Sequence, residues 1–287
     1  MRFESFRRER AGSAGSKKEG ACMAKRVIVG LLLCLMVIAM LFLGNTVEAI
    51  VFTLGAILAV HELEQAIKKS GFAPFMAPAY AFAALYAFFA YRLTLMSLAM
   101  LWIICILAII CERILNQKRK TEETFLSLGA FAYPLPLFAV LFLLAISFGS
   151  ERGISALLLA FACPLVGDSF AFFIGTYFGK HKLCPEISPK KTVEGSIASV
   201  FGSIAGAVAV YFLQPLWGVS LPIWPILVLG AVCGFLGQVG DLFASVIKRW
   251  ANIKDFGSIF PGHGGMLDRV DSVLLCAPAV YFCFYLL

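Results

Sequence analysis

Long apolar runs alternate with short polar segments along the chain after residue 26. A helix needs ~20 apolar residues to cross a hydrocarbon layer of ~30 Å. On this criterion the pattern predicts nine membrane-spanning helices, at 27–44, 47–67, 73–91, 93–112, 125–148, 153–178, 195–214, 222–247 and 270–287. The connecting loops are short, which favours one compact bundle with its weakest seam at 113–124. We therefore predict an all-α, polytopic membrane protein.

Composition supports this fold class. Of the 287 residues, 61% are hydrophobic and 14% are charged, and the mean hydropathy is +0.89. Such a chain has too little polar material to cover a soluble globular surface. The net charge of +7 does not indicate a nucleic-acid partner, because residues 1–26 hold eight Lys/Arg against three Glu and the remainder holds 16 against 14. The nine cysteines form no CxxC pair, so neither a zinc site nor a disulfide framework is predicted.

Basic residues fall almost entirely in alternate loops. If the N-terminus is cytoplasmic, the inside loops carry 16 Lys/Arg and the outside loops carry only Arg92 and Arg152. This is a strong positive-inside pattern. It predicts a multi-pass protein of the inner (cytoplasmic) membrane with a cytoplasmic N-terminus, and polar loops that face the cytoplasm.

Carboxylates inside the predicted spans are the first sign of chemistry. Asp168 lies in the span at 153–178 and Asp241 in the span at 222–247. An ionised aspartate facing lipid costs a few kcal/mol or more, so both are expected to face the bundle interior, water or a cation. The structural alternative is a buried partner for a lysine or a hydroxyl. Glu62 and Glu64 are less informative, because the lysines at 68–69 follow within two turns and can pair with them.

A second acidic pair begins the last span. Asp268 and Asp271 are spaced i, i+3, which places them on one helix face. Mg²⁺ typically takes one or two carboxylates together with phosphate oxygens and water, so we predict a divalent ion there rather than a simple helix N-terminal charge effect. Gly264 and Gly265 just before the pair permit a close approach of backbone N–H groups to phosphate. His263 is left open as a base, a phosphate donor or a loop brace.

Another polar loop, Ser-Pro-Lys-Lys-Thr-Val-Glu-Gly at 188–195, offers two lysines and two hydroxyls just before a span. That composition suits a polyphosphate ligand. Taken alone, the segment is equally a capped helix start with interfacial lysines.

Together these motifs resemble the bacterial phosphatidate cytidylyltransferases, also called CDP-diacylglycerol synthases. The resemblance is detailed over 167–272, and the first five spans match only in hydrophobic character. The motifs that carry it are Gly167-Asp168-Ser169, the 188–195 segment, Gly240-Asp241-Leu-Phe-Ala-Ser245, Lys248-Arg249, Lys254-Asp255-Phe-Gly257 and Pro261-Gly-His-Gly-Gly-Met-Leu-Asp-Arg-Val-Asp271.

The resemblance implies transfer of the cytidylyl group of CTP to phosphatidic acid at the cytoplasmic membrane face. The products would be CDP-diacylglycerol, a phospholipid precursor, and pyrophosphate. The implied cofactor is Mg²⁺, with a second cation left open, and the implied partners are CTP, phosphatidic acid and the lipid bilayer. No nucleic-acid partner is expected, and a homodimer is left open. Phosphatidate is already anionic, so no strong base is needed and His263 is not an obligatory catalyst.

Site roles are assigned by the resemblance together with the residue chemistry. The expected catalytic residues are Asp241, Lys248, Arg249, Asp268, Arg269 and Asp271. The expected substrate-binding residues are Asp168, Ser188, Lys190, Lys191, Thr192, Glu194, His263, Gly264 and Gly265. The expected metal ligands are Asp241, Asp268 and Asp271.

The chain divides accordingly into three parts. Residues 1–22 are polar and precede a second start-like sequence, Met-Ala-Lys-Arg, so we interpret them as an added leader or a disordered tail. Residues 23–124 are expected to form N-terminal transmembrane helices, and 125–287 the helices that carry the active site.

Two other readings share some of these features. A CTP- or ATP-dependent kinase or nucleotidyl transferase acting on an isoprenoid lipid would use a similar metal and nucleotide. A cation-coupled transporter would also carry intramembrane aspartates, but it would not need the phosphate-type loops.

Overall fold

The computed structural model describes residues 35, 39, 43–92, 95–260 and 264–287. The predicted span at 27–44 and the leader at 1–22 lie outside these residues, apart from isolated positions. The described helices are α2 (Asn45–Lys69), α3 (Ala77–Arg92), α4 (Leu95–Leu115), α5 (Thr121–Ala132), α6 (Leu135–Ile146), α7 (Ser150–Phe178), α8 (Val193–Leu213), α9 (Ile223–Trp250) and α10 (Leu267–Leu286). A 3₁₀ turn, η1 (Gln214–Trp217), follows α8, and a hairpin, β1 (Lys182–Cys184) and β2 (Ser188–Thr192), precedes it.

These helices confirm the predicted all-α membrane bundle. Seven helical segments within the described ranges are long and apolar enough to cross a membrane, with α5 and α6 counted together as one. The predicted span at 125–148 is broken because Pro134 supplies no backbone N–H and Tyr133 before it is extended, with φ −135° and ψ 118°.

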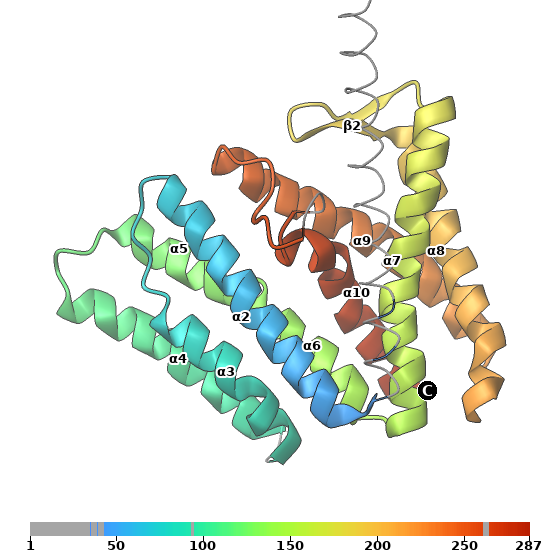
Figure 1. Cartoon of the computed structure of the whole chain (residues 1–287), viewed down its shortest axis with the longest axis horizontal. Coiled ribbons are helices and arrows are strands. Elements are labelled where there is room, and N and C mark those ends of the chain that lie inside the picture. Colours follow the sequence, from blue (N-terminus) through green and yellow to red (C-terminus); the bar gives the residue numbers. More distant parts are fainter. Residues whose placement is uncertain (1–34, 36–38, 40–42, 93–94, 261–263) are drawn as a thin grey trace, which may run out of the picture.

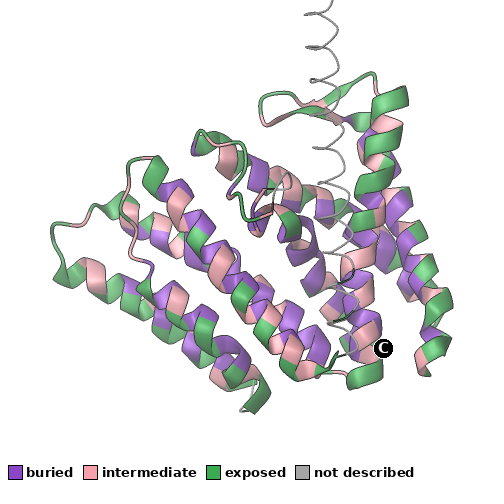
Figure 2. Ribbon diagram, in the orientation of Figure 1, coloured by how far each residue is buried: buried purple, intermediate pink, exposed green. Residues whose placement is uncertain are grey.

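The helices form two groups, which Figure 1 shows side by side. Helices α2 to α6 make up one group, and α7 to α10 the other. Helix α10 packs against α6, α7 and α9, and it also touches α2, so it joins the groups. Buried side chains concentrate on the faces that the helices turn toward one another (Figure 2).

Glycines let three of the helices pack closely. A side chain at Gly206 of α8 would press on the backbone of α7 at Ala162. A side chain at Gly234 of α9 would lie 2.7 Å from the Cα atom of Val200 on α8. Small residues at such positions let membrane helices approach until their backbones touch, which brings the ends of α7, α8 and α9 together.

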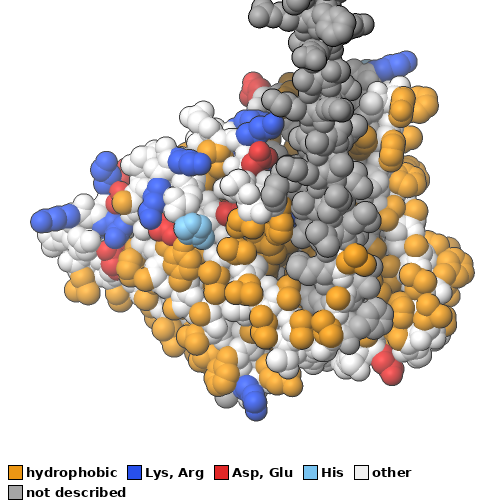
Figure 3. All heavy atoms as spheres, viewed as in Figure 1, with side chains coloured by type: hydrophobic (Ala, Val, Ile, Leu, Met, Phe, Trp, Pro, Cys, Tyr) orange, Lys and Arg blue, Asp and Glu red, His pale blue; other side chains and the backbone are white. Residues whose placement is uncertain are grey.

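Charged side chains collect at one end of the bundle. In Figure 3 the Lys, Arg, Asp and Glu side chains lie mainly toward the upper part of the visible face, and hydrophobic side chains cover most of the part below. The same end carries β2, the C-terminal end of α2 and the loop that leads into α10 (Figure 1). This end therefore holds most of the polar residues that the sequence marks as functional.

Candidate functional site

Three aspartates from three different helices form an acidic cluster: Asp168 of α7, Asp241 of α9 and Asp271 of α10. Each carboxylate lies close enough to the other two to interact with them electrostatically. Asp168 is not covered by other parts of the protein although it lies ten residues before the end of its helix, whereas Asp271 is buried. Like charges repel at this range, so cations around the cluster stabilise its ionised form.

The hairpin delivers one of these cations. Lys191 of β2 places its Nζ 2.7 Å from Oδ2 of Asp241, with the two side chains 23% and 34% exposed. The hairpin is held in place by Arg249, whose Nε donates to the carbonyl of Ile187 at 3.0 Å. Lys190 and Lys191 are neighbours on an extended strand and therefore point to opposite faces. Lys190 is exposed.

Thr192 and Glu194 have bracing roles in the structure. The Thr192 hydroxyl accepts from the backbone N–H of Gly195 at 3.1 Å and so caps the start of α8. Glu194 pairs with Nδ1 of His181 at 2.7 Å and also accepts from the backbone N–H of His181. The sequence left open whether residues 188–195 include a capped helix start, and in the structure Thr192 does cap α8. Ser188 begins β2 opposite Cys184 and is half-buried.

Asp268 organises the loop before α10. Its side chain is 3% exposed, and Oδ1 pairs with Nζ of Lys248 at 2.8 Å. Oδ2 accepts from the backbone N–H of Phe256 at 2.8 Å and of Gly265 at 3.0 Å. Both oxygens are therefore held by the protein, and Lys248 is fixed over the Phe256 ring, 5.6 Å from its centroid.

Asp271 lies one helical turn further and faces the acidic cluster. Its Oδ1 accepts from the backbone N–H of Ser272 at 2.7 Å. A side chain at Gly240 would overlap with the carbonyl oxygen of Asp271, so glycine is needed beside Asp241 for α9 and α10 to meet here. Arg269 is exposed and lies within electrostatic range of Asp168.

The two glycines predicted to cradle phosphate have different environments. Gly264 has φ +84°, a conformation that strongly favours glycine. Gly265 is buried, and its N–H is already donated to Asp268. His263 lies outside the described residues.

Glu62 of α2 is the residue that the sequence interpretation passed over. Its carboxylate accepts from the backbone N–H groups of Met266 and Leu267, each at 2.8 Å. Glu62 was discounted because a lysine could pair with it. In the structure Lys68 pairs with Glu64 instead, at 2.7 Å. An acidic residue inside a predicted membrane span was the only signal, and its partners lie about 200 residues away in the chain.

The oxygens of the three predicted metal ligands differ in their surroundings. Asp241 and Asp271 carry the hard oxygens that Mg²⁺ prefers, and Asp168 is close to both. The oxygens of Asp268 are occupied by Lys248 and backbone N–H groups. Among the described residues no three acidic, His or Cys side chains converge on one point as ready ligands. The donor set therefore fits an ion that takes one or two carboxylates and completes its shell with substrate oxygens and water.

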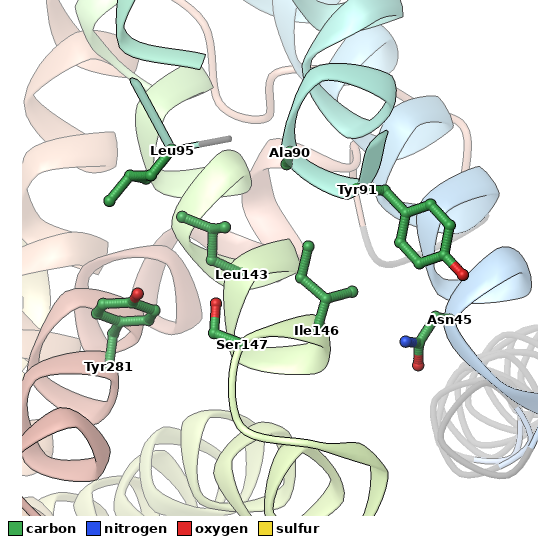
Figure 4. A pocket seen from close by; sticks show the side chains of 8 residues that line it. All are labelled: Asn45, Ala90, Tyr91, Leu95, Leu143, Ile146, Ser147 and Tyr281. Atoms are coloured by element: carbon green, nitrogen blue, oxygen red, sulfur yellow. The ribbon is translucent and has the colours of Figure 1, made fainter. Parts of the chain in front are cut away.

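A cavity of about 310 Å³ lies well away from this cluster. Figure 4 shows its lining, which includes Asn45, Tyr91 and Tyr281. Asn45 begins α2 and Glu62 lies 17 residues further along that helix, which corresponds to roughly 25 Å at 1.5 Å per residue. Because Glu62 contacts the start of α10, the cavity lies toward the other end of the bundle.

These features define a class of protein: a helical integral membrane protein whose polar end combines acidic and basic side chains suited to phosphate compounds. Residues 24–287 match the family model described as "Cytidylyltransferase family", and the chain belongs to that family.

Three curated relatives are similar to this chain, and each is called phosphatidate cytidylyltransferase. The protein from Synechocystis sp. is 42% identical over 137 residues, which are 47% of this chain and 45% of the relative. The Bacillus subtilis protein is 42% identical over 124 residues, or 42% and 45% of the two chains. The Staphylococcus aureus protein is 40% identical over 129 residues, or 45% and 48%. The matched part spans just under half the length of these relatives.

Proposed function

We propose that the protein transfers the cytidylyl group of CTP to phosphatidic acid, forming CDP-diacylglycerol and pyrophosphate for phospholipid synthesis. The observation that carries this proposal is the acidic cluster at the polar end of three membrane helices. Lys191 forms an ion pair with Asp241 of the cluster, and Lys248 lies within electrostatic range of Asp271. Membership of the cytidylyltransferase family and the names of the curated relatives support the same reaction.

The reaction brings two polyanions together. A phosphate oxygen of phosphatidate attacks the α-phosphorus of CTP, a new P–O bond forms, and the bond to the β-phosphate oxygen breaks to release pyrophosphate. Catalysis of such a step is mainly positioning and charge neutralisation. Lys191, Lys248 and Arg269 supply positive charge around the acidic cluster.

Lys248 is the best-positioned of these cations. Asp268 and the Phe256 ring hold its ammonium group in one place, and it is within electrostatic range of Asp271. Lys191 is placed by the hairpin and pairs with Asp241. Binding of a nucleotide phosphate would compete for Lys191, so we infer that this ion pair opens when CTP binds.

Asp241 and Asp271 would hold Mg²⁺, with Asp168 close by. The bound ion would supply charge neutralisation and polarisation of phosphate oxygens. Asp268 is instead assigned a positioning role, because its oxygens are occupied by Lys248 and by backbone N–H groups.

The polar end of the bundle is proposed to face the cytoplasm, as the positive-inside pattern predicts. Phosphatidate would then reach the site laterally from the inner leaflet of the cytoplasmic membrane, and CTP would arrive from the aqueous side. The exposed position of Asp168 within α7 supports a route for water and polar substrate groups to the acidic cluster.

A double-label assay tests this proposal. Purified protein in phosphatidate-containing vesicles is incubated with Mg²⁺ and CTP labelled either on the α-phosphate or on the γ-phosphate. We expect the α-label in the lipid fraction and the γ-label in soluble pyrophosphate. Transfer of the γ-label to lipid would instead identify a kinase, and transfer of the α-label only when phosphatidate is replaced by an isoprenoid phosphate would identify a different acceptor. Either result would contradict the proposal.

A further inference from the structure

A carboxylate from the first helix group reaches into the loop that carries the site. Glu62 is 3% exposed, and its two oxygens accept separately from Met266 N–H and Leu267 N–H, each at 2.8 Å. These donors open α10, where backbone N–H groups have no partners within the helix. A negative charge there is also favoured by the helix dipole. Glu62 thus caps α10 from another helix.

Two glycines of the loop are needed to admit this carboxylate. A Cβ atom at Gly257 would lie 2.5 Å from Oε1 of Glu62, and a Cβ atom at Gly265 would overlap with both of its oxygens. Gly265 has a negative φ, so backbone conformation does not explain the glycine there. Part of the glycine-rich pattern is therefore explained by Glu62 rather than by a bound phosphate.

Two buried carboxylates hold consecutive backbone N–H groups where the loop enters α10. Asp268 accepts from the N–H groups of Phe256 and Gly265, and Glu62 accepts from the next two, of Met266 and Leu267. Four backbone donors are thus fixed by two carboxylates, and Asp268 in turn fixes Lys248. Three residues after Asp268, Asp271 projects into the acidic cluster.

We propose that Glu62 is a positioning residue for the transfer reaction: its carboxylate fixes the start of α10, and through it the placement of Asp268, Lys248 and Asp271. This inference rests on the proposed function for the reaction that is affected. It gives the N-terminal helices a direct part in building the site, because α2 supplies the carboxylate.

Hydrogen exchange of the backbone amides tests the contact without reference to activity. In Glu62→Gln one oxygen acceptor becomes an amide donor, so at least one of the two charge-assisted hydrogen bonds is lost. We expect the amides of Met266 and Leu267 to exchange about tenfold faster, which corresponds to about 1.4 kcal/mol. Glu64→Gln is the matched control, because Glu64 lies two residues away on α2 and pairs with Lys68 and Tyr80 instead. In Glu64→Gln the backbone amides of residues 265–268 should exchange at the wild-type rate.

Kinetics distinguish positioning from general support of the fold. Glu62→Gln should lower kcat by about tenfold, because the start of α10 is then less well fixed. KM for CTP should change by less than about threefold, because Glu62 contacts backbone groups and not a predicted substrate-binding side chain. Glu64→Gln should keep both constants. Equal kcat values for Glu62→Gln and the wild-type protein would overturn the proposal.

Gly257→Ala in the wild-type background covers the case in which Glu62→Gln does not fold, because it disturbs the contact from the loop and keeps the carboxylate. A double-mutant cycle extends this test. Gly257→Ala introduces a methyl group against the Glu62 carboxylate and should lower kcat by about tenfold in the wild-type background, but by less than about twofold in the Glu62→Ala background. Equal effects in the two backgrounds would overturn the proposal.

The outcomes also separate this inference from the function itself. If the wild-type protein transfers no cytidylyl group, the proposed function fails, and the exchange measurement still decides whether Glu62 fixes the loop. If the wild-type protein is active and Glu62→Gln matches it in kcat, the Glu62 inference alone fails.

Discussion

Asp268 and Asp271 show how two identical side chains three residues apart come to lie in different surroundings. The sequence treats them as one metal-binding pair. In the structure Asp268 is enclosed by Lys248 and two backbone N–H groups, whereas Asp271 faces two other carboxylates. The difference arises from the loop before α10, which wraps around the first aspartate and leaves the second turned toward the acidic cluster.

Replacement of each aspartate by asparagine should separate stability from chemistry. Asp268→Asn leaves Lys248 without its buried partner and should lower the free energy of unfolding by about 3 kcal/mol. Asp271→Asn removes a charge that its neighbours repel, so the protein should melt at the wild-type temperature or above it. Thermal unfolding of the detergent-solubilised variants measures both effects. Wild-type stability of Asp268→Asn would contradict the role assigned to it.

At this scale the structure brings together aspartates that the sequence marked, but the sequence did not predict their contact partners. Asp168 and Asp241 were marked because charge inside a membrane span is costly, and the structure places both beside Asp271. Glu62 was discounted because its partners, Met266 and Leu267, are set by the tertiary fold. No local pattern around residue 62 indicates a contact about 200 residues away.

Close helix packing around α8 is the main feature at the scale of elements. Gly234 of α9 lies against the backbone of Val200 in α8, so added volume has no free space to occupy. This contact helps to place α9, and with it Asp241, beside the hairpin that carries Lys191.

Two glycine-to-alanine variants test this packing. Gly234→Ala adds a methyl group against helix backbone and should destabilise the protein by about 1–3 kcal/mol, because overpacked contacts force the helices apart. Gly129→Ala in α5 is the matched control, since no atom outside its local backbone lies within 4 Å of the added carbon. It should be neutral or stabilising, because alanine favours helix over glycine. Equal melting temperatures for the two variants would contradict the packing account.

Hydrophobic length predicted the helices but not their interruptions. Each of the eight predicted spans that falls within the described residues corresponds to helix, with ends displaced by a few residues. The break at Pro134 was missed because the residues on both sides are equally apolar. The hairpin at 182–192 was missed because its strands are short and rich in lysine, with no alternating pattern to reveal them.

At the scale of the whole molecule, the site depends on both helix groups. The acidic cluster comes from α7, α9 and α10, and the cap on α10 comes from α2. The division at residue 124 stays a prediction about the order of segments along the chain. Under the proposed function, the helices that carry the polar end would also border the lipid from which phosphatidate would come.

The central claim is that the acidic cluster carries out cytidylyl transfer, and Asp241 tests it most directly. Asp241 is partly exposed at the surface of α9, so Asp241→Asn should remain folded. Glu151→Gln is the control, because Glu151 is an exposed carboxylate at the other end of α7 from Asp168. The measurement is the rate at which α-labelled CTP labels phosphatidate in vesicles with Mg²⁺. We predict a loss of at least about a hundredfold for Asp241→Asn and a wild-type rate for Glu151→Gln. An Asp241→Asn protein that labels lipid at more than about half the wild-type rate would contradict the account.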